Sequence, residues 1–182
     1  MTLVPELYCD DIYCITPDHL KNYGVKAVIL DIDNTLVPYE IPEPTEEVRA
    51  WLSSLEEAGI KIAFVSNNHP PRVEKFNETL GYPAFPDSGK PLKKACRAAI
   101  EALGTTPETT AIIGDQVFTD VLAGRNAGLA CAFLVKPIKD KTNLFFRFKR
   151  LLEVPVLRKY KRLHRTDGSR HAPAGENASR RR

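Results

Sequence analysis

The stretch AVILDIDNTLVPYE, residues 27–40, places two aspartates directly after four apolar residues. A short apolar run without helical periodicity predicts a buried strand. Carboxylates rarely lie at the edge of a core without a partner, because removing a charge from water costs free energy. Asp31 and Asp33, at the end of such a strand, therefore indicate a site that compensates their charge.

The rest of the chain alternates predicted strands with predicted helices. Three more apolar runs predict buried strands: 61–66, 109–115 and 129–135. Helical periodicity, first-turn signals and helix-ending glycines predict four helices: 45–59, 71–81, 91–104 and 120–128. This alternation predicts right-handed crossovers and a mainly parallel sheet with helices on both faces. The expected fold class is α/β, with three layers in a Rossmann-like arrangement.

Polar residues follow three of the predicted strands, at the edge where open parallel sheets bind their ligands. They are Asp31 and Asp33 after the first strand, Ser66, Asn67 and Asn68 after the second, and Asp115 and Asp120 after the third. Carboxylates gathered at one point repel one another and need a cation. An all-oxygen ligand set suits Mg²⁺, which usually takes one or two carboxylates together with a substrate phosphate.

This set of residues suits phosphoryl transfer. A carboxylate can be the nucleophile and form an aspartyl-phosphate. Phosphoryl transfer then needs little beyond positioning and positive charge around the phosphoryl oxygens. Ser66 and Asn67 would donate hydrogen bonds to that group, and Lys90 would supply a point charge. The residues alone thus predict a Mg²⁺-dependent phosphatase that uses an aspartate.

Four motifs, in the expected order, resemble those of the haloacid dehalogenase (HAD) superfamily. They are DIDNTL (31–36), VSN (65–67), KP (90–91) and GDQVFTD (114–120), the last in the form GDxxxxD. The resemblance implies a HAD-like fold. It also implies that Asp31 attacks phosphorus, and that Asp33 protonates the leaving oxygen and later activates the hydrolytic water.

The same resemblance assigns the remaining positions of the site. It implies that Ser66 and Lys90 hold the phosphoryl group. The implied Mg²⁺ ligands are the Asp31 side chain, the Asp33 backbone carbonyl and the Asp115 side chain. Asp120 would either contribute through a water molecule or orient Lys90.

Each position also has a plain structural explanation, which the sequence leaves open. The aspartates of the first motif could be turn formers, and the serine and asparagine of the second an ordinary loop cap. Lys90 could be a solvated lysine at a helix start, with Lys93 and Lys94 as nearby rivals. Asp115 and Asp120 could be helix N-caps without any part in chemistry.

The spacing between the motifs indicates which branch of the family the chain resembles. Only 32 residues separate Asp33 from Ser66, and 21 separate Asn68 from Lys90, which leaves no room for a large cap domain. The site is therefore expected to be open. Residues 3–37 resemble the start of the YqeG-like branch of HAD phosphatases, in the capless subfamily IIIA. That branch is similar to the mitochondrial phosphatidylglycerophosphate phosphatases, which implies a phospholipid headgroup as the substrate.

The net charge of +3 hides an asymmetry along the chain. Residues 136–182 carry a net charge of +11, and residues 1–135 carry −8. Such a split indicates an anionic partner for the basic part, either a membrane surface or nucleic acid. We expect a phosphatase domain over 1–142, a basic amphipathic helical segment over 143–164, and a disordered basic tail over 165–182.

The segment 143–164 has the pattern of a helix that lies in an anionic membrane interface. Its apolar face would hold Leu144, Phe145, Phe148, Leu151 and Leu152, and its basic face Arg147, Lys149 and Arg150. Pro155 is expected to break or kink this helix into two pieces. The alternative is that the apolar face packs on the sheet while the basic side chains are simply solvated.

Three functions remain open from the sequence. The first is a peripheral phosphatase acting on phosphatidylglycerophosphate. The second is a HAD phosphatase for a sugar, a nucleotide or a phosphoprotein. The third is a nucleic-acid- or ribosome-binding protein on a HAD scaffold. Nucleic acid is disfavoured as a partner, because no RNA-binding motif is recognisable and the C-terminal aromatics lie on a predicted helix.

The sequence also bears on where the protein acts. It contains no run of about eighteen apolar residues and no signal-peptide layout. The expected location is the cytoplasm, at the inner face of the membrane if the substrate is a lipid. Four cysteines without a CxxC pair fit reduced thiols, with no disulfide and no zinc: Cys9, Cys14, Cys96 and Cys131.

Overall fold

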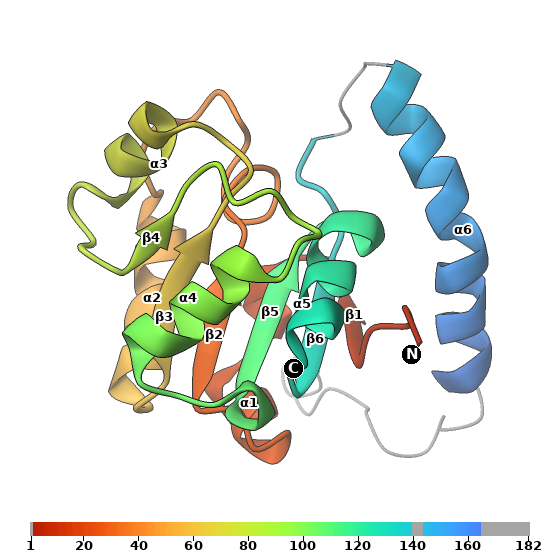
Figure 1. The fold of residues 1–182 in the computed structure, drawn as a ribbon, viewed down its shortest axis with the longest axis horizontal. Coiled ribbons are helices and arrows are strands. Elements are labelled where there is room, and N and C mark those ends of the chain that lie inside the picture. The colour runs from red at the N-terminus through yellow and green to blue at the C-terminus, as the bar shows by residue number, and fades with distance from the viewer. Residues whose placement is uncertain (1, 140–143, 165–182) are drawn as a thin grey trace, which may run out of the picture.

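The computed structural model describes residues 2–139 and 144–164 (Figure 1). Its centre is a six-stranded sheet in the order β1-β6-β5-β2-β3-β4, in which every neighbouring pair of strands is parallel. The strands are β1 (Leu7–Cys9), β2 (Ala27–Leu30), β3 (Lys61–Val65), β4 (Ala84–Phe85), β5 (Thr110–Gly114) and β6 (Cys131–Val135). The predicted α/β fold with a parallel sheet is therefore confirmed.

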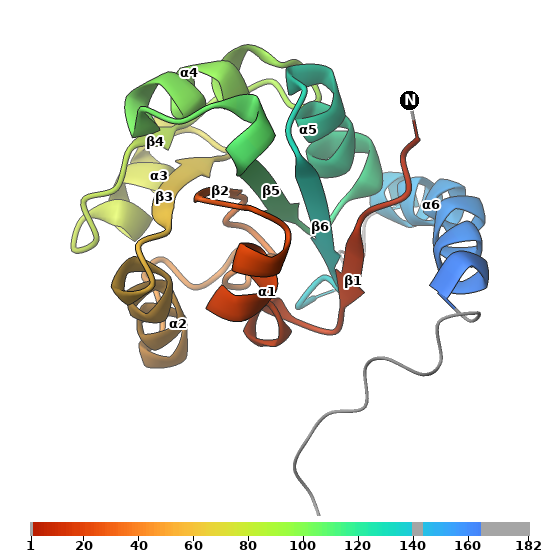
Figure 2. The same ribbon diagram turned by 90° about the horizontal axis from the view of Figure 1, so that it is seen from below.

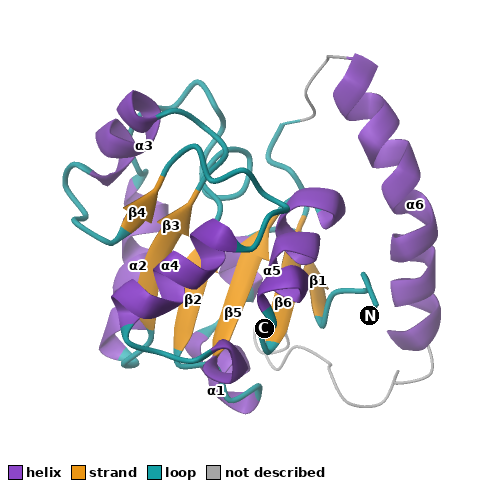
Figure 3. Cartoon of the chain, in the orientation of Figure 1, coloured by secondary structure: helices purple, strands orange, loops and turns teal. Residues whose placement is uncertain are grey.

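Helices cover both faces of the sheet and complete the three layers (Figures 2 and 3). One face is covered by α1 (Pro17–Asn22), α2 (Glu46–Glu57) and α3 (Pro70–Asn77). The other is covered by α4 (Lys94–Leu103) and α5 (Leu122–Ala127), and α6 (Leu144–His164) lies beside β1. Short helical turns form η1 (Ile12–Cys14), η2 (Pro107–Thr109) and η3 (Val117–Val121), the last of them π-helical.

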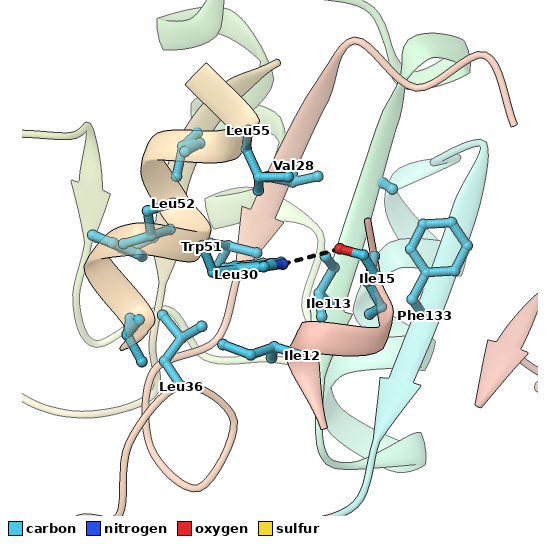
Figure 4. Close-up of a cluster of buried hydrophobic side chains, with 14 of the residues drawn as sticks. Ile12, Ile15, Val28, Leu30, Leu36, Trp51, Leu52, Leu55, Ile113 and Phe133 are labelled. Carbon is cyan, nitrogen blue, oxygen red and sulfur yellow. Dashed lines mark hydrogen bonds between the residues drawn. The ribbon is translucent and has the colours of Figure 1, made fainter. Parts of the chain in front are cut away.

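The central strand β2 shows how one apolar run serves two faces. Its four residues alternate between the two apolar clusters, and all of them are fully buried. On the face of α2, Trp51 packs among aliphatic side chains and donates its Nε1–H to the Ile15 carbonyl oxygen at 2.9 Å (Figure 4). This bond satisfies the only polar atom of the indole ring inside the core.

The order of the strands places a topological switch point between β2 and β5. From β2 the chain continues to β3 and β4 on one side, and then returns to β5 and β6 on the other. Leu30 of β2 lies in register with Ile113 of β5, and the Asp31 N–H bonds to the Ile113 carbonyl oxygen at 3.0 Å. In open α/β sheets such a switch point, at the carboxyl ends of the strands, is where ligands bind.

Short connections leave this carboxyl edge uncovered. Between β2 and β3 the chain forms a loop and α2, and between β3 and β4 it forms α3 and a turn. Neither connection contains a further domain. The expectation of a fold without a large cap is therefore confirmed.

Several elements differ from the sequence-based expectation. The sequence patterns predict neither β1 nor α1, because elements this short show no clear apolar periodicity. The strand β4 is shorter still, with only two residues. The helix expected over 91–104 begins at Lys94, since the N–H of Leu92 bonds back to the Gly89 carbonyl oxygen in a turn. The helix expected over 120–128 begins earlier, at Val117 in η3.

Two cysteines contradict the expectation of four reduced thiols. The turn between β1 and η1 brings the Cα atoms of Cys9 and Cys14 to 6.3 Å, and the two residues are joined in a disulfide. A separation of that size suits a disulfide, but it depends on a local turn that spacing along the chain does not reveal. Cys96 and Cys131 are free and buried, as expected.

The C-terminal segment is a single helix. Pro155 lies inside α6 and does not divide it, contrary to the expectation of two pieces. Val156 and Leu157, directly after the proline, pack against the apolar cluster of the sheet, and this packing outweighs the local preference of proline. The predicted faces over 144–150 concern side chains outside the described residues, as does the predicted disorder over 165–182.

Membrane crossing can be assessed for the described helices. None of them combines the length and the apolar composition needed to span a bilayer.

Candidate active site

The turn after β2 carries two aspartates to the carboxyl edge. Ile32, between them, is fully buried and anchors the turn in the core. Asn34 adopts a left-handed conformation with φ of 65°, which asparagine tolerates better than most residues. Its N–H bonds to the Val37 carbonyl oxygen at 2.8 Å and closes the turn. Asp31 and Asp33 are thereby fixed at the sheet edge, where each meets different partners.

Lys90 lies at the centre of the site. Its Nζ is 2.5 Å from Asp31 Oδ1 and 2.7 Å from Asp120 Oδ1, and the side chains of Lys90 and Asp120 are each 2% exposed. Burial by itself disfavours the ammonium, but the Asp120 and Asp31 carboxylates outweigh it and raise the pKa of Lys90. Lys93 and Lys94, its rivals from the sequence, are exposed.

Asp31 experiences opposing electrostatic influences. Burial raises the pKa of its carboxyl, Lys90 lowers it, and Asp120 and Asp115 raise it again, to a resulting value of about 7. Thr35 adds a hydrogen bond from its hydroxyl to Asp31 Oδ2 at 3.2 Å. A carboxyl with so high a pKa needs further positive charge to be fully ionised at neutral pH.

Three buried aspartates form an acidic cluster. Asp31, Asp115 and Asp120 each offer one carboxylate oxygen, and these oxygens lie within 4.8 Å of one another. Among the described residues, Lys90 is the cation in contact with this cluster, and a divalent cation would further reduce the repulsion among its carboxylates. Buried oxygen donors that converge in this way suit a hard divalent ion such as Mg²⁺. The donor set of the site therefore fits the predicted metal.

Gly114 is required by the close packing of this cluster. A Cβ atom at Gly114 would lie 2.3 Å from Cγ of Asp120, which is shorter than any tolerable contact. The glycine thus lets β5 end against the Asp120 side chain. Asp120 Oδ2 accepts a hydrogen bond from the Gln116 N–H at 3.0 Å, while Oδ1 contacts Lys90. The expected orientation of Lys90 by Asp120 agrees with this contact, whereas Asp120 lies inside η3 and is not the N-cap of a helix.

Asp33 contacts Asn68, which the sequence places at this edge of the sheet, and Arg72, which it does not assign to the site. Its Oδ1 lies 3.0 Å from Nη2 and 3.2 Å from Nε of Arg72, and its Oδ2 accepts a hydrogen bond from Asn68 Nδ2 at 3.0 Å. The side chains of Arg72 and Asp33 are each 12% exposed. Arg72 lies in the first turn of α3, directly beyond the carboxyl end of β3. Ser66 is predicted because polar residues just beyond the carboxyl end of a strand lie at the ligand-binding edge. The same criterion, applied also to the first turn of the following helix, would have identified Arg72.

Ser66 and Asn67 follow β3 and differ in role. Ser66 is 1% exposed, and its Oγ accepts a hydrogen bond from the Asn68 N–H at 3.1 Å, so its hydroxyl hydrogen can still donate. The Asn67 side chain holds the loop of Lys90: its Oδ1 accepts from Lys90 N–H at 2.7 Å and its Nδ2 donates to Lys90 O at 3.1 Å. A phosphate contact by Asn67 would therefore have to use its backbone N–H or the second hydrogen of Nδ2.

Two hollows open at the carboxyl edge on either side of the segment 136–138. The larger, of about 490 Å³, lies against the turn after β2. The smaller, of about 380 Å³, lies against α6. Its lining includes Tyr8, Asp115, Glu153 and Leu157. Room for an organic group is thus present beside Asp115.

Comparison with known proteins agrees with this geometry. A family model described as haloacid dehalogenase-like hydrolase matches residues 39–128. The chain is 38% identical over 159 residues to a protein of Bacillus subtilis (strain 168) named "Probable phosphatase YqeG". That alignment covers 87% of this chain and 92% of the relative.

Solved structures share the fold at low sequence identity. One is the cobalt-bound deoxy-D-mannose-octulosonate 8-phosphate phosphatase YrbI from Haemophilus influenzae, with a TM-score of 0.54 and 20% identity over 77% of this chain and 91% of that chain. Another is an uncharacterized protein from Listeria monocytogenes serotype 4b, with a TM-score of 0.51 and 18% identity over 65% and 85% of the chains. These two show the fold alone.

The likeness to YqeG extends over nearly the whole of both proteins. It includes the turn of Asp31 and Asp33, which lies before the region matched by the family model. Sequence, fold and acidic site therefore lead to the same assignment. The chain belongs to the haloacid dehalogenase-like hydrolases, on their YqeG-like branch.

Proposed function

We propose that this hydrolase removes phosphate from a phosphomonoester through an aspartyl-phosphate on Asp31, with Mg²⁺ as its cofactor. The observation that carries the proposal is the buried contact of Lys90 with Asp31 and Asp120, together with Asp115 at the same point. A buried network of this kind is costly to form and adds little net stability. Its presence at the carboxyl edge of the sheet, where such folds bind ligands, is better explained by chemistry.

Two half-reactions follow from the positions of the aspartates. In the first, an Oδ atom of Asp31 attacks phosphorus, the bond from phosphorus to the leaving oxygen breaks, and Asp33 protonates that oxygen. In the second, water attacks the aspartyl-phosphate, Asp33 accepts its proton, and inorganic phosphate leaves as Asp31 is regenerated. Mg²⁺, held by Asp31, the Asp33 carbonyl and Asp115, would supply positive charge at the phosphoryl oxygens.

The remaining groups act by position and charge. Lys90 already lies against the nucleophile, so its ammonium can contact a phosphoryl group bound to Asp31. Ser66 can donate its hydroxyl hydrogen to the same group. Arg72 and Asn68 hold the Asp33 carboxylate, whereas Lys90 contacts the carboxylates of Asp31 and Asp120. This arrangement separates the nucleophile from the acid/base, as a two-step mechanism needs.

For the substrate we propose phosphatidylglycerophosphate, at the cytoplasmic face of a membrane. Support comes from the resemblance of residues 3–37 to the YqeG-like branch, which is similar to the mitochondrial phosphatidylglycerophosphate phosphatases, and from a site that no large cap domain encloses. Such a site can accept a headgroup whose lipid stays in the bilayer. Further support comes from α6, where Leu151 and Leu152 are 67% and 47% exposed and basic residues follow over 158–162.

A phosphomonoester free in solution is the competing substrate. One observation favours it: Val156 and Leu157 of α6 pack on the body of the protein. This half of the helix therefore needs no membrane to cover its apolar side chains. The catalytic residues would be the same for both substrates, so only the leaving group distinguishes them.

Replacing the nucleophile tests the reaction. The variant Asp31→Asn should keep the fold, because an amide has nearly the same shape. It should lower the turnover of p-nitrophenyl phosphate to below about one thousandth of the parental rate, since no aspartyl-phosphate can form. Asp18→Asn, a change at an exposed aspartate of α1, is the matched control. Substantial turnover by a folded Asp31→Asn protein would exclude the mechanism.

A substrate panel tests the leaving group. Phosphate release should be measured for phosphatidylglycerophosphate in vesicles, a hexose phosphate, a nucleoside monophosphate and a phosphopeptide. We expect the largest kcat/KM for the lipid, by about tenfold or more, which corresponds to about 1.4 kcal/mol of transition-state binding. Hydrolysis of a soluble ester without hydrolysis of the lipid would refute the lipid substrate and leave the phosphatase assignment intact.

Arg72 should matter for the rate rather than for binding. The variant Arg72→Ala removes two contacts of the Asp33 carboxylate, so the acid/base is less well positioned when the leaving oxygen departs. We expect kcat for p-nitrophenyl phosphate to fall by about tenfold to a hundredfold, with KM changed little. Lys75→Ala, at an exposed lysine of the same helix, should leave kcat unchanged. An unaltered kcat in Arg72→Ala would contradict this role.

Mg²⁺ and protons should compete for Asp31. Its pKa in the folded protein is about 7 against an ordinary value of 3.8. The carboxyl therefore contributes stability that is fully present below the ordinary value and is lost as pH rises through about 7. Mg²⁺ should restore that loss, because it favours the ionised form.

The measurement is the midpoint of thermal unfolding with and without Mg²⁺. The increase caused by Mg²⁺ should be larger at about pH 8 than at about pH 5.5. In Asp31→Asn the increase should be smaller and nearly the same at both pH values. An equal increase at both pH values in the parent protein would be evidence against competition at Asp31.

A further inference from the structure

Helix α6 lies outside the region matched by the family model, yet one of its side chains reaches the loop and first helical turn over 115–120, which carry Asp115 and Asp120. Glu153 is 2% exposed, and its Oε1 accepts a hydrogen bond from the Val117 N–H at 2.8 Å. A carboxylate so deeply buried costs free energy unless a donor compensates it. Here the donor belongs to the loop between Asp115 and Asp120.

The position of Val117 makes this hydrogen bond significant. Val117 opens η3, which continues into α5 as one helical run, and Asp115 lies two residues before it. Gln116, at the N-cap position of the run, makes no capping bond with its own side chain. Asp120 accepts the Gln116 N–H, and Glu153 accepts the next one. The start of the run is thus capped from inside by Asp120 and from outside by α6.

Contacts further along α6 hold Glu153 in place. Val156 and Leu157 pack against the apolar cluster of the sheet. The Tyr160 hydroxyl accepts a hydrogen bond from the Tyr8 N–H at 3.1 Å, and the two rings meet edge to face with centroids 6.0 Å apart. These residues lie three, four and seven positions after Glu153, on the same face of the helix. The face that packs on β1 therefore also delivers the carboxylate.

Glu153 and Asp115 also line the same hollow of about 380 Å³. No rigid element of the sheet lies between the helix and the loop at this point, since the carboxylate contacts the loop backbone directly. A change in the length of the Glu153 side chain should therefore be felt at Asp115, on one side of Val117, and at Asp120, on the other.

We propose that Glu153 is a positioning residue for the divalent-cation site. Its hydrogen bond to the Val117 N–H fixes the loop so that the Asp115 carboxylate faces Asp31 and the Asp120 carboxylate faces Lys90. The inference rests on the proposed function only in taking Asp115 as a cation ligand. Helix α6 would then take part in the cation site through Glu153, in addition to any membrane contact made by its outward-facing residues.

Three substitutions in the full chain distinguish a positioning role of the Glu153 hydrogen bond from an effect of the Glu153 charge and from simple anchoring of α6. Glu153→Gln keeps an oxygen acceptor at the same reach and removes the charge. Glu153→Asp keeps the charge and shortens the reach by one methylene. Glu153→Ala removes both. Glu101→Ala, at an exposed glutamate of α4, is the matched control.

The readout is the Mg²⁺ concentration that gives half of the full thermal stabilisation, checked by Mn²⁺ binding from water-proton relaxation. We expect Glu153→Gln and Glu101→Ala to remain within about threefold of the parent protein. Glu153→Asp and Glu153→Ala should require about tenfold more Mg²⁺, because the loop no longer holds Asp115 in place. The pair of Gln and Asp variants decides the question if the Ala variant does not fold.

Two results would overturn the inference. If Glu153→Asp unfolds at a lower temperature but binds Mg²⁺ as the parent does, Glu153 merely anchors α6. If Glu153→Gln binds Mg²⁺ as weakly as Glu153→Asp, the charge and not the hydrogen bond is responsible. Neither result depends on turnover, so both differ from failure of the proposed function, which would appear as absent phosphate release by a parent protein that binds Mg²⁺.

Discussion

The ammonium of Lys90, buried between the carboxylates of Asp31 and Asp120, is the contact on which the rest of the site depends. Asp31 directly follows β2 and Asp120 lies in η3, after the adjacent strand β5, and without a cation between them the two carboxylates would repel each other. The surrounding structure serves this contact. Asn67 holds the backbone of Lys90 on both sides, and Gly114 leaves the space that the Asp120 side chain occupies.

Much of this could be predicted from the sequence, because the signals are local. Apolar runs that end in polar residues identify three central strands, and the parallel order then requires their ends to meet at one edge. Asp31, Lys90, Asp115 and Asp120 do converge there. The absence of a cap follows from counting residues between motifs. In each case the prediction depends on residue type and spacing, and not on the partner that a side chain finds in space.

Where the partner is distant in sequence, prediction fails for a physical reason. Arg72 looks like any charged residue of an amphipathic helix except for its position shortly after β3, and its contact with Asp33 is set by the packing of α3 against the sheet. Glu153 is the one acidic residue of a basic helix, and only the docking of α6 turns it inward. The helix also continues through Pro155, and the turn after β1 joins Cys9 to Cys14. Tertiary contacts decide all of these, and local propensity does not.

In the proposed mechanism, Asp31 is the nucleophile that bonds to phosphorus, beside Lys90 and a cation at Asp115. A crystal structure of the protein with Mg²⁺ and beryllium trifluoride, which mimics a phosphoryl group on a carboxylate, tests it most directly. The account predicts beryllium bonded to a carboxylate oxygen of Asp31, Mg²⁺ in contact with Asp31 and Asp115, and Lys90 Nζ within hydrogen-bond distance of a fluorine. Beryllium on another residue, or a cation that does not contact Asp115, would contradict it.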